Sequence, residues 1–478
     1  MAQTAQLRSI DVVENEAQRI FKLQREGYLR DPYPSLEERR NRLRALERIL
    51  LENTEAIVDA IGQDFGHRCA EESKILEIFP VVDGIRHTLK QLRKWMRPQR
   101  RDVSVLFATG SNRVVPQPKG VVGVISPWNY PLFLTLSPLV SILAAGNRAM
   151  IKMASNSQHL CRLLADKFSE VYPEDTVAIL PGVRAGDFST LPYDHIIFTG
   201  SADAGRTVMR SAADNLTPVT LELGGKSPTI VCDDFDIEEA ASRILYAKFV
   251  NAGQTCLAPD YLFLPEAAQE RFVDAAQRIM PERYPDPNDQ SYTSVIDEKS
   301  YRRLRMTLDD AAAKGAKLVP LVPDATFNDV LRKIPPHLVL DVTGDMMIMQ
   351  EEIFGPLFPV MAYESLDEVI EYVTTRDRPL GFYVFSNDRA RQEKLLYSTI
   401  SGGVTINNCI IHVAQHDLPF GGVGASGIGH YHGYDGFVEF SKMRPVFKNP
   451  RFSLLSLFYP PYTGRQNRLI DLLLKWKP

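Results

Sequence analysis

Between residues 115 and 225, short apolar runs alternate with stretches whose apolar residues recur at helical spacing. Strands that alternate with helices in this way form a parallel sheet with helices on both faces. We therefore predict a doubly wound α/β fold, in which ligands bind beyond the carboxyl ends of the strands. The predicted strands are residues 121–126, 149–153, 177–180, 195–200 and 219–223.

A second α/β block follows over about residues 225–425. Its predicted strands are residues 227–233, 261–265, 338–342, 357–363 and 402–408. Before residue 115 the chain is predicted to be helical. Ser35 and Glu38 fit a capping box, and the apolar residues after them recur at helical spacing: Leu43, Leu46, Ile49 and Leu50. A chain of 478 residues is too long for one core, so two or three domains are expected.

Composition narrows the class of protein. The net charge of −4 gives no reason to expect nucleic acid as a partner, and the basic run at 93–101 is typical of a solvated helix end. The longest apolar region is interrupted by Pro127, Pro131 and Pro138, so no stable membrane insertion is expected. The five cysteines are odd in number and far apart, which indicates a reducing compartment and favours a cytoplasmic protein.

The sequence NAGQTCLAP, residues 251–259, places Cys256 among small, polar and turn-forming residues. A free cysteine is among the most buried residue types, so this loop alone does not distinguish a packed side chain from a nucleophile. Three other residues are equally open to two interpretations. Asn129 could cap the helix that follows it, and Glu222 and Glu352 could be paired surface acids.

Four motifs, taken together, favour the functional interpretation of these residues: SPWNYP, LELGGKSP, NAGQTC and EEIFGP. In this order and spacing they resemble the aldehyde dehydrogenase superfamily, over residues 35–447. In that family the glutamate of LELGG precedes the thiol by 34 positions, as Glu222 precedes Cys256 here. The short N-terminus, YPPY at 459–462 and the tail resemble the dimeric class 3 branch. The segments around Cys256 and over 412–433 look closest to bacterial coniferyl-aldehyde dehydrogenases.

The resemblance implies an enzyme that oxidises an aldehyde to a carboxylic acid with NAD or NADP. Cys256 would attack the aldehyde as a thiolate, giving a tetrahedral hemithioacetal whose oxyanion can expel hydride. The oxyanion donors of the family correspond to the side-chain amide of Asn129 and the backbone N–H of Cys256. Glu222 corresponds to the general base that activates water against the thioester. Because the thiolate attacks, we expect a polar, partly accessible setting for Cys256.

Cofactor residues follow from the same resemblance, although SPWNYP stands where a G-x-G-x-x-G fingerprint could open the first turn. Gly200 and Gly205 fit either a phosphate-facing helix start or a plain turn. Many NAD-preferring relatives carry a glutamate where this chain has Ser155, so NADP is permitted as well as NAD. The residues assigned to the cofactor are Ser126, Trp128, Lys152, Ser155, Gly200, Ser201, Gly205, Leu223, Glu352 and Phe354.

The resemblance places the aldehyde tunnel along the helix after Asn129. Ser137 is small where some relatives carry tryptophan, which leaves room for a bulky aromatic aldehyde of the cinnamaldehyde, coniferaldehyde or benzaldehyde type. Medium- or long-chain aliphatic aldehydes are the alternative, ahead of a CoA-acylating dehydrogenase or a non-catalytic structural paralogue. The predicted substrate residues are Tyr130, Phe133, Leu134, Ser137, Thr255, Leu257 and His412.

Histidine pairs at 412/416 and 430/432 could suggest a metal, but neighbouring proline and glycine argue against a helix that presents both members of the first pair, so no metal is expected. We expect a homodimer. In the tail, Leu469, Leu473 and Trp476 recur at helical spacing and could touch a membrane, although packing on the protein or its dimer mate is favoured. The predicted parts are an NAD(P)-binding domain (1–101 and 119–224), a catalytic domain (225–425), a small β oligomerisation element (102–118 and 437–447) and a C-terminal tail (448–478).

Overall fold

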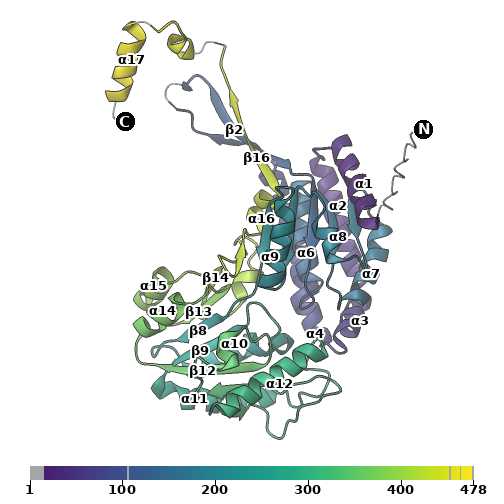
Figure 1. Cartoon of the computed structure of the whole chain (residues 1–478), viewed down its shortest axis with the longest axis vertical. Helices are drawn as coiled ribbons and strands as arrows, with labels where there is room; N and C mark the ends of the chain where they lie inside the picture. The colour runs from purple at the N-terminus through teal and green to yellow at the C-terminus, as the bar shows by residue number, and fades with distance from the viewer. Residues whose placement is uncertain (1–14, 105–106, 452–453, 463, 476–478) are drawn as a thin grey trace, which may run out of the picture.

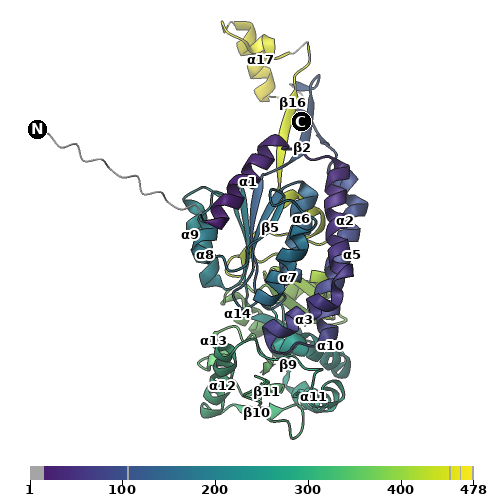
Figure 2. The same cartoon turned by 90° about the vertical axis from the view of Figure 1, so that its right-hand side faces the viewer.

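The computed structural model describes residues 15–104, 107–451, 454–462 and 464–475. Its strands form three sheets, and helices pack on the two larger ones, which confirms the predicted α/β class (Figure 1). The two large sheets make up the body, and the third sheet extends away from it as an arm (Figure 2).

Six strands in the order β15-β7-β6-β3-β4-β5 form the first sheet. All five strands predicted in this region are confirmed, and they pair in parallel. An unpredicted antiparallel strand, β15, adds to the edge and pairs Gly427 with Glu222. The bounds are β3 (Val121–Ile125), β4 (Arg148–Lys152), β5 (Val177–Ile179), β6 (His195–Thr199), β7 (Val219–Glu222) and β15 (Gly427–Ile428).

Helices cover both faces of this sheet. One face packs on α6 (Phe133–Ala145) and α7 (Gln158–Ser169), with α2 (Leu36–Glu52), α3 (Thr54–Phe65) and α5 (Phe79–Trp95) outside them. The other face packs on α1 (Glu16–Arg30), α8 (Ala185–Ser189) and α9 (Ala202–Ala213). Ser35 caps α2, because its hydroxyl accepts the N–H of Glu38 at 3.2 Å, but the predicted capping box is only half formed, since the side chain of Glu38 pairs with Arg42.

Seven strands in the order β10-β11-β12-β9-β8-β13-β14 form the second sheet. The bounds are β8 (Ser227–Val231), β9 (Pro259–Pro265), β10 (Lys317–Pro320), β11 (His337–Leu340), β12 (Leu357–Tyr363), β13 (Gly381–Phe385) and β14 (Gly403–Ile406). One face packs on α10 (Ile237–Phe249) and α11 (Gln269–Arg283), and the other on α12 (Glu298–Ala313), α13 (Met347–Gln350), α14 (Leu366–Thr374) and α15 (Arg389–Ser398). The sequence analysis missed β10 and β13. All five residues of β13 are buried, so its apolar run GFYVF was the available signal.

The arm consists of β1 (Gln99–Arg101), β2 (Ser111–Pro118) and β16 (Ser441–Lys448), all paired antiparallel. The predicted oligomerisation segments overlap it, but α16 (Gly433–Glu439) occupies the start of the second segment, and β1 precedes the first. At the end of the arm lie η6 (Leu454–Phe458) and α17 (Gly464–Lys475) (Figure 1). Trp476 lies outside the described residues, whose helices are all too short or too polar to cross a bilayer.

Candidate active site

A cavity of about 210 Å³ lies at the carboxyl ends of the first sheet's strands, against loops of the second sheet. Asn129 follows β3, Glu222 ends β7, Cys256 precedes β9 and Glu352 precedes β12. All four line this cavity. The four motifs, spread over more than 220 positions, therefore contribute to one site.

The loop before Cys256 has an unusual backbone. Asn251, Ala252 and Gly253 all have positive φ, of 54°, 51° and 73°, which is costly for the two residues that are not glycine. A Cβ on Gly253 would lie 2.3 Å from the carbonyl oxygen of Gly355, so only glycine fits there. The loop therefore needs support from its surroundings.

Gln254 supplies part of that support and was missed by the sequence analysis. Its side-chain amide donates to the carbonyl oxygens of Asn251 and Ser294, each at 3.0 Å, and its side-chain oxygen accepts the N–H of Ile296 at 2.9 Å. Gln254 is fully buried, and a buried polar side chain normally has such partners. Only the folded chain reveals them, because Ser294 and Ile296 lie 40 or more positions away.

The thiol of Cys256 is partly exposed, while the other four cysteines are buried, and all five are free. Burial, followed by the nearby negative charges of Glu352 and Glu222, raises the pKa of Cys256 to about 12. Cys256 is partly accessible, as expected, and acidic groups are among its neighbours, but burial together with those negative charges favours the protonated thiol over the thiolate. The thiol therefore needs a positive charge or a proton acceptor beside it to react.

Glu222 carries a buried carboxylate. It is 2% exposed, and neither of its carboxylate oxygens has a hydrogen-bond partner among the described residues. Burial, with a contribution from the charge of Glu439, raises the pKa of Glu222 well above its usual range. A carboxylate with a raised pKa is a stronger base, and perturbed acids in a cavity are typical of catalytic sites.

Asn129 is buried, and its side-chain amide donates to the carbonyl oxygen of Gln254 at 3.2 Å. One amide hydrogen makes this bond, so the second can serve another acceptor. The helix-capping alternative is wrong, since α6 begins at Phe133 and the carboxylate of Glu77 accepts the N–H groups of Leu132 and Phe133.

The cavity also has features that fit a dinucleotide. Ser201 is the N-cap of α9, and the positive end of a helix attracts phosphate. A Cβ on Gly205 would lie 2.8 Å from Leu223, so glycine permits this close approach. The buried Oε1 of Glu352 has no partner among the described residues and could accept a hydroxyl. The predicted cofactor residues on the cavity wall are Trp128, Gly200, Ser201, Leu223, Glu352 and Phe354.

The other predicted cofactor residues lie off this wall: Ser126, Lys152, Ser155 and Gly205. The amine of Lys152 is half-buried and donates to the carbonyl oxygen of Met153 at 3.0 Å, and burial lowers the pKa of Lys152. The hydroxyl of Ser126 is bonded to that of Thr135 at 2.7 Å. Ser155 is exposed.

Two residues that the sequence analysis missed hold the loop of Glu352. Lys226 pairs with Asp260 and donates to the carbonyl oxygen of Glu351 at 2.8 Å. Asp260 accepts the N–H of Ile353 at 2.9 Å. Burial, followed by the charge of Asp260, raises the pKa of Glu352 to about 8. Lys226 belongs to the LELGGKSP motif, which was the available signal.

A second cavity, of about 560 Å³, lies on the other side of α6. Phe133 and Ser137 line it, whereas Leu134 lines the catalytic cavity, so α6 is a wall common to both. Most of its other lining is apolar or aromatic, including Leu76, Phe79, Val140, Tyr246, Ile410 and Val413. Three predicted substrate residues therefore line a cavity, Phe133 and Ser137 the larger one and Leu134 the catalytic one.

The remaining predicted substrate residues line neither cavity and instead form hydrogen bonds with neighbouring parts of the chain. The hydroxyls of Tyr130 and Thr255 are bonded at 2.7 Å. The carbonyl oxygen of Leu257 accepts the hydroxyl of Tyr383 at 2.6 Å. His412 bonds to Thr405, and burial lowers the pKa of His412 to about 4. Within the described ranges, no three histidine, cysteine or acidic side chains are grouped to hold a metal.

Comparison with known proteins defines the class. The profile of the aldehyde dehydrogenase family matches residues 14–446. The chain therefore belongs to this family and is an NAD(P)-dependent oxidoreductase, as the four motifs predicted.

Individual relatives cover nearly the whole chain. A "probable coniferyl aldehyde dehydrogenase" of Pseudomonas aeruginosa is 48% identical over 459 residues, which is 95% of this chain and 96% of the relative. The substrate-bound structure of Staphylococcus aureus AldH is 32% identical, with a TM-score of 0.90 over 96% of this chain and 100% of that one. A betaine aldehyde dehydrogenase of Staphylococcus aureus, solved with NAD⁺, is 25% identical, with a TM-score of 0.81 over 94% of this chain and 90% of that one.

Proposed function

We propose that this protein oxidises bulky aromatic aldehydes to carboxylic acids with NAD or NADP. The observation that carries the proposal is the cavity of about 560 Å³ beside the catalytic one, walled by aromatic and aliphatic side chains. Aromatic rings that pack edge-to-face or offset contribute about 0.5–1.5 kcal/mol beyond their burial. The name of the Pseudomonas aeruginosa relative points to the same kind of substrate.

In the first step, the thiol of Cys256 releases its proton to water, the thiolate sulfur bonds to the aldehyde carbon, and the electron pair of the carbonyl π bond moves onto the oxygen, which becomes negative. The second amide hydrogen of Asn129 and the backbone N–H of Cys256 donate to that oxygen. When bound, the oxidised cofactor would supply the hydride acceptor and a positive charge, which would oppose the burial and the acidic side chains of Glu352 and Glu222 that raise the pKa of Cys256 to about 12.

In the second step, the thioester on Cys256 is hydrolysed. Glu222 takes a proton from water as the water oxygen bonds to the acyl carbon, and the carbon–sulfur bond then breaks, which restores the cysteine. One aldehyde, one water and one oxidised cofactor give one acid, one reduced cofactor and one proton. Ser201, Glu352 and Phe354 are the residues that would hold the cofactor, at its pyrophosphate, nicotinamide ribose and nicotinamide.

Medium-chain aliphatic aldehydes are the second candidate substrates. The lining of the larger cavity is apolar, and burial stabilises a ring or a chain by about 25 cal/mol per Å². Transfer of the acyl group to CoA is disfavoured by the unpartnered acid Glu222 beside the thiol. Acid release without CoA will distinguish hydrolysis from acyl transfer.

We expect kcat/KM for cinnamaldehyde or benzaldehyde to exceed that for acetaldehyde by at least about 100-fold, or roughly 2.7 kcal/mol, because acetaldehyde fills little of the cavity. Ser137→Trp should lower the aromatic values selectively, since an indole at this position occupies the wall of the larger cavity. Ser137→Ala is the matched control and should leave them unchanged. Full aromatic activity in Ser137→Trp, or acetaldehyde as the best substrate, would contradict this assignment.

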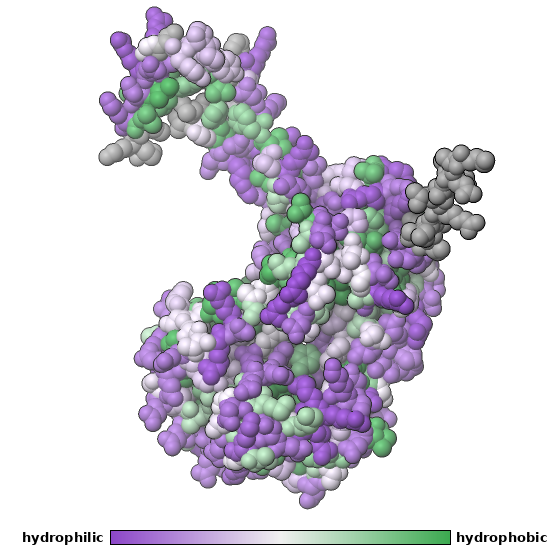
Figure 3. All heavy atoms as spheres, in the orientation of Figure 1, coloured by the Kyte–Doolittle hydropathy of each residue, from purple (hydrophilic) through white to green (hydrophobic). Residues whose placement is uncertain are grey.

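We also propose that the enzyme is a homodimer of the cytoplasm. Its five free cysteines suit a reducing compartment. The arm and tail expose large apolar side chains, including Phe447, Leu457, Tyr462, Leu472 and Leu474 (Figure 3), as surfaces that bind another chain do. Light scattering at micromolar concentration should give twice the mass of one chain, and the mass of a single chain would exclude the dimer.

A further inference from the structure

A buried ion pair beside the active site has no part in the mechanism above. The guanidinium of Arg68 lies 2.8 Å from a carboxylate oxygen of Glu77, and both side chains are completely buried. Arg68 also stacks on the rings of Phe65 and Tyr130, at 4.9 and 4.8 Å from their centroids. Because removing two charges from water costs more than burying two apolar side chains, the pair is weak evidence for stability alone.

One end of a cluster of buried charges, formed by Arg68 and Glu77, binds the segment that begins at Asn129. Arg68 donates to the backbone carbonyl oxygen of Asn129 at 2.8 Å. The other carboxylate oxygen of Glu77 accepts the N–H groups of Leu132 and Phe133, at 2.7 and 3.2 Å. The segment from Asn129 to the start of α6 is therefore attached to both members of the ion pair.

The other end holds the loop of Cys256. The carboxylate of Glu72 accepts the backbone N–H of Asn251 at 3.1 Å and the hydroxyl of Thr293 at 2.8 Å. The side-chain amide of Asn251 donates to the carbonyl oxygens of Asn129 and Gln254, both at 3.1 Å. Asn251 is one of the residues with positive φ, so these bonds hold a conformation that the backbone would otherwise leave.

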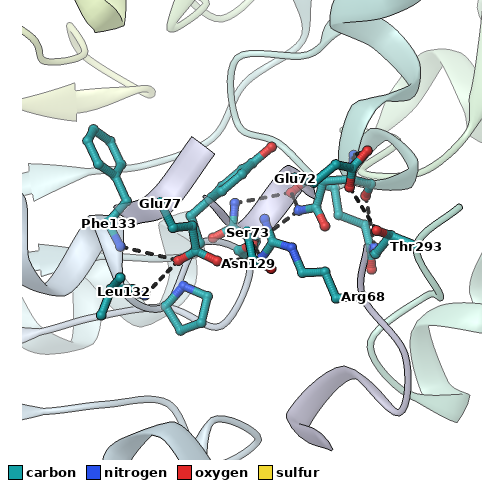
Figure 4. A network of polar contacts seen from close by, with 12 residues as sticks. Arg68, Glu72, Ser73, Glu77, Asn129, Leu132, Phe133 and Thr293 are labelled. Atoms are coloured by element: carbon teal, nitrogen blue, oxygen red, sulfur yellow. Dashed lines mark hydrogen bonds and ion pairs between the residues drawn. The ribbon is translucent and has the colours of Figure 1, made fainter. Parts of the chain in front are cut away.

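A π-helical turn joins the two ends. Glu72 lies in α4 (Ala70–Ser73) and Glu77 in η1 (Lys74–Ile78), a π-helix. Side chains on one face of an α-helix are three or four positions apart, whereas the wider π turn has i→i+5 bonds. Glu77 pairs with Arg68, whereas Glu72, five positions earlier, bonds to Asn251 and Thr293, and Figure 4 shows the resulting chain of contacts from Phe133 to Thr293.

We propose that Arg68, Glu72 and Glu77 are positioning residues that set the two oxyanion donors relative to each other. One donor is the side-chain amide of Asn129, which begins the backbone segment bonded to Arg68 and Glu77. The other donor is the backbone N–H of Cys256, which lies in the loop bonded to Glu72. Donors act on a developing oxyanion only when both stand at hydrogen-bond distance from the same point. This inference rests on the proposed aldehyde oxidation and adds residues that never touch the substrate.

The test uses the full-length chain with benzaldehyde and NADP or NAD, whichever the wild type reduces. Glu72→Ala removes the acceptor for the N–H of Asn251, whereas Glu72→Gln restores an acceptor for that N–H and a donor toward Thr293. Glu71→Gln is the matched control, because Glu71 is an exposed neighbouring acid that contacts the thiol of Cys69. We measure the pre-steady-state rate of cofactor reduction, alkylation of Cys256 by iodoacetamide, cofactor binding and the melting temperature.

In Glu72→Ala, cofactor reduction should slow by roughly 10- to 100-fold, as expected for a small misplacement of catalytic groups. Alkylation needs no oxyanion donor and should keep its wild-type rate, as should cofactor binding and melting. Glu72→Gln should recover most of the lost rate, and Glu71→Gln should match the wild type.

A parallel fall in reduction, alkylation and melting temperature would show a merely structural role and overturn the inference. An unchanged reduction rate in Glu72→Ala would overturn it as well. Failure of the wild type to reduce cofactor with benzaldehyde and with cinnamaldehyde would overturn the proposed function and this inference together. For the other end of the cluster, Arg68→Met with Glu77→Gln removes both charges of the ion pair together and should slow reduction without slowing alkylation.

Discussion

Replacing Cys256 by alanine is expected to abolish aldehyde oxidation, with a fall in kcat of at least about a thousandfold, because no other group can form the adduct that releases hydride. The cofactor should still bind, since the other residues of the cavity wall remain. Stopped-flow and steady-state measurement of cofactor reduction, with cofactor binding followed by fluorescence, will test both statements.

Cys232→Ala is the matched control for this substitution. Cys232 is also a free cysteine, but it is buried in the core of the second sheet, away from the cavity. The control should retain full activity per folded molecule. Turnover of Cys256→Ala within tenfold of the wild type would show that Cys256 is not the nucleophile.

The second large effect is expected at Glu222. Glu222→Gln keeps the size of the side chain but cannot take a proton from water, so acylation proceeds and hydrolysis slows. We expect a pre-steady-state burst of roughly one equivalent of reduced cofactor per active site, followed by turnover at least about 100-fold slower than that of the wild type. Rapid-mixing absorbance of the reduced cofactor will measure both phases.

Loss of the burst together with turnover would contradict this role. The raised pKa of Cys256 gives that result a specific meaning, since Glu222 would then be the acceptor of the thiol proton. Glu238→Gln, at an exposed position on α10, is the control and should leave burst and turnover unchanged.

Short-range patterns in the sequence were sufficient for much of the fold. The five parallel strands of the first sheet are apolar runs bounded by turns, so their positions follow from local periodicity. Strand β13, next to the edge strand of the second sheet, has a similar run and was missed, and β15 is too short to leave a pattern. Such strands form through pairing between segments far apart in the sequence. Strand β15, for example, gains its partner β7 only when the chain has folded.

The sequence by itself was sufficient to predict which residues carry the chemistry. Cys256, Glu222, Asn129 and Glu352 stand in motifs whose order and spacing are specific to one family, and the fold brings all four to one cavity. The sequence also indicated where the larger cavity lies, through Phe133 and Ser137 on α6. It did not indicate that Leu257 and His412 line neither of the two cavities.

Only the tertiary structure determined which partners hold those residues in position and how the pKa values of their side chains are shifted. The pKa of Cys256 depends on two acids from distant motifs, so the preference for a protonated thiol could not be inferred from its neighbours in the chain. The supports of the site, Gln254, Asp260, Arg68 and Glu72, act through hydrogen bonds and ion pairs to residues up to 221 positions away. Their energies depend on distance and burial, and both are set by the folding of the whole chain.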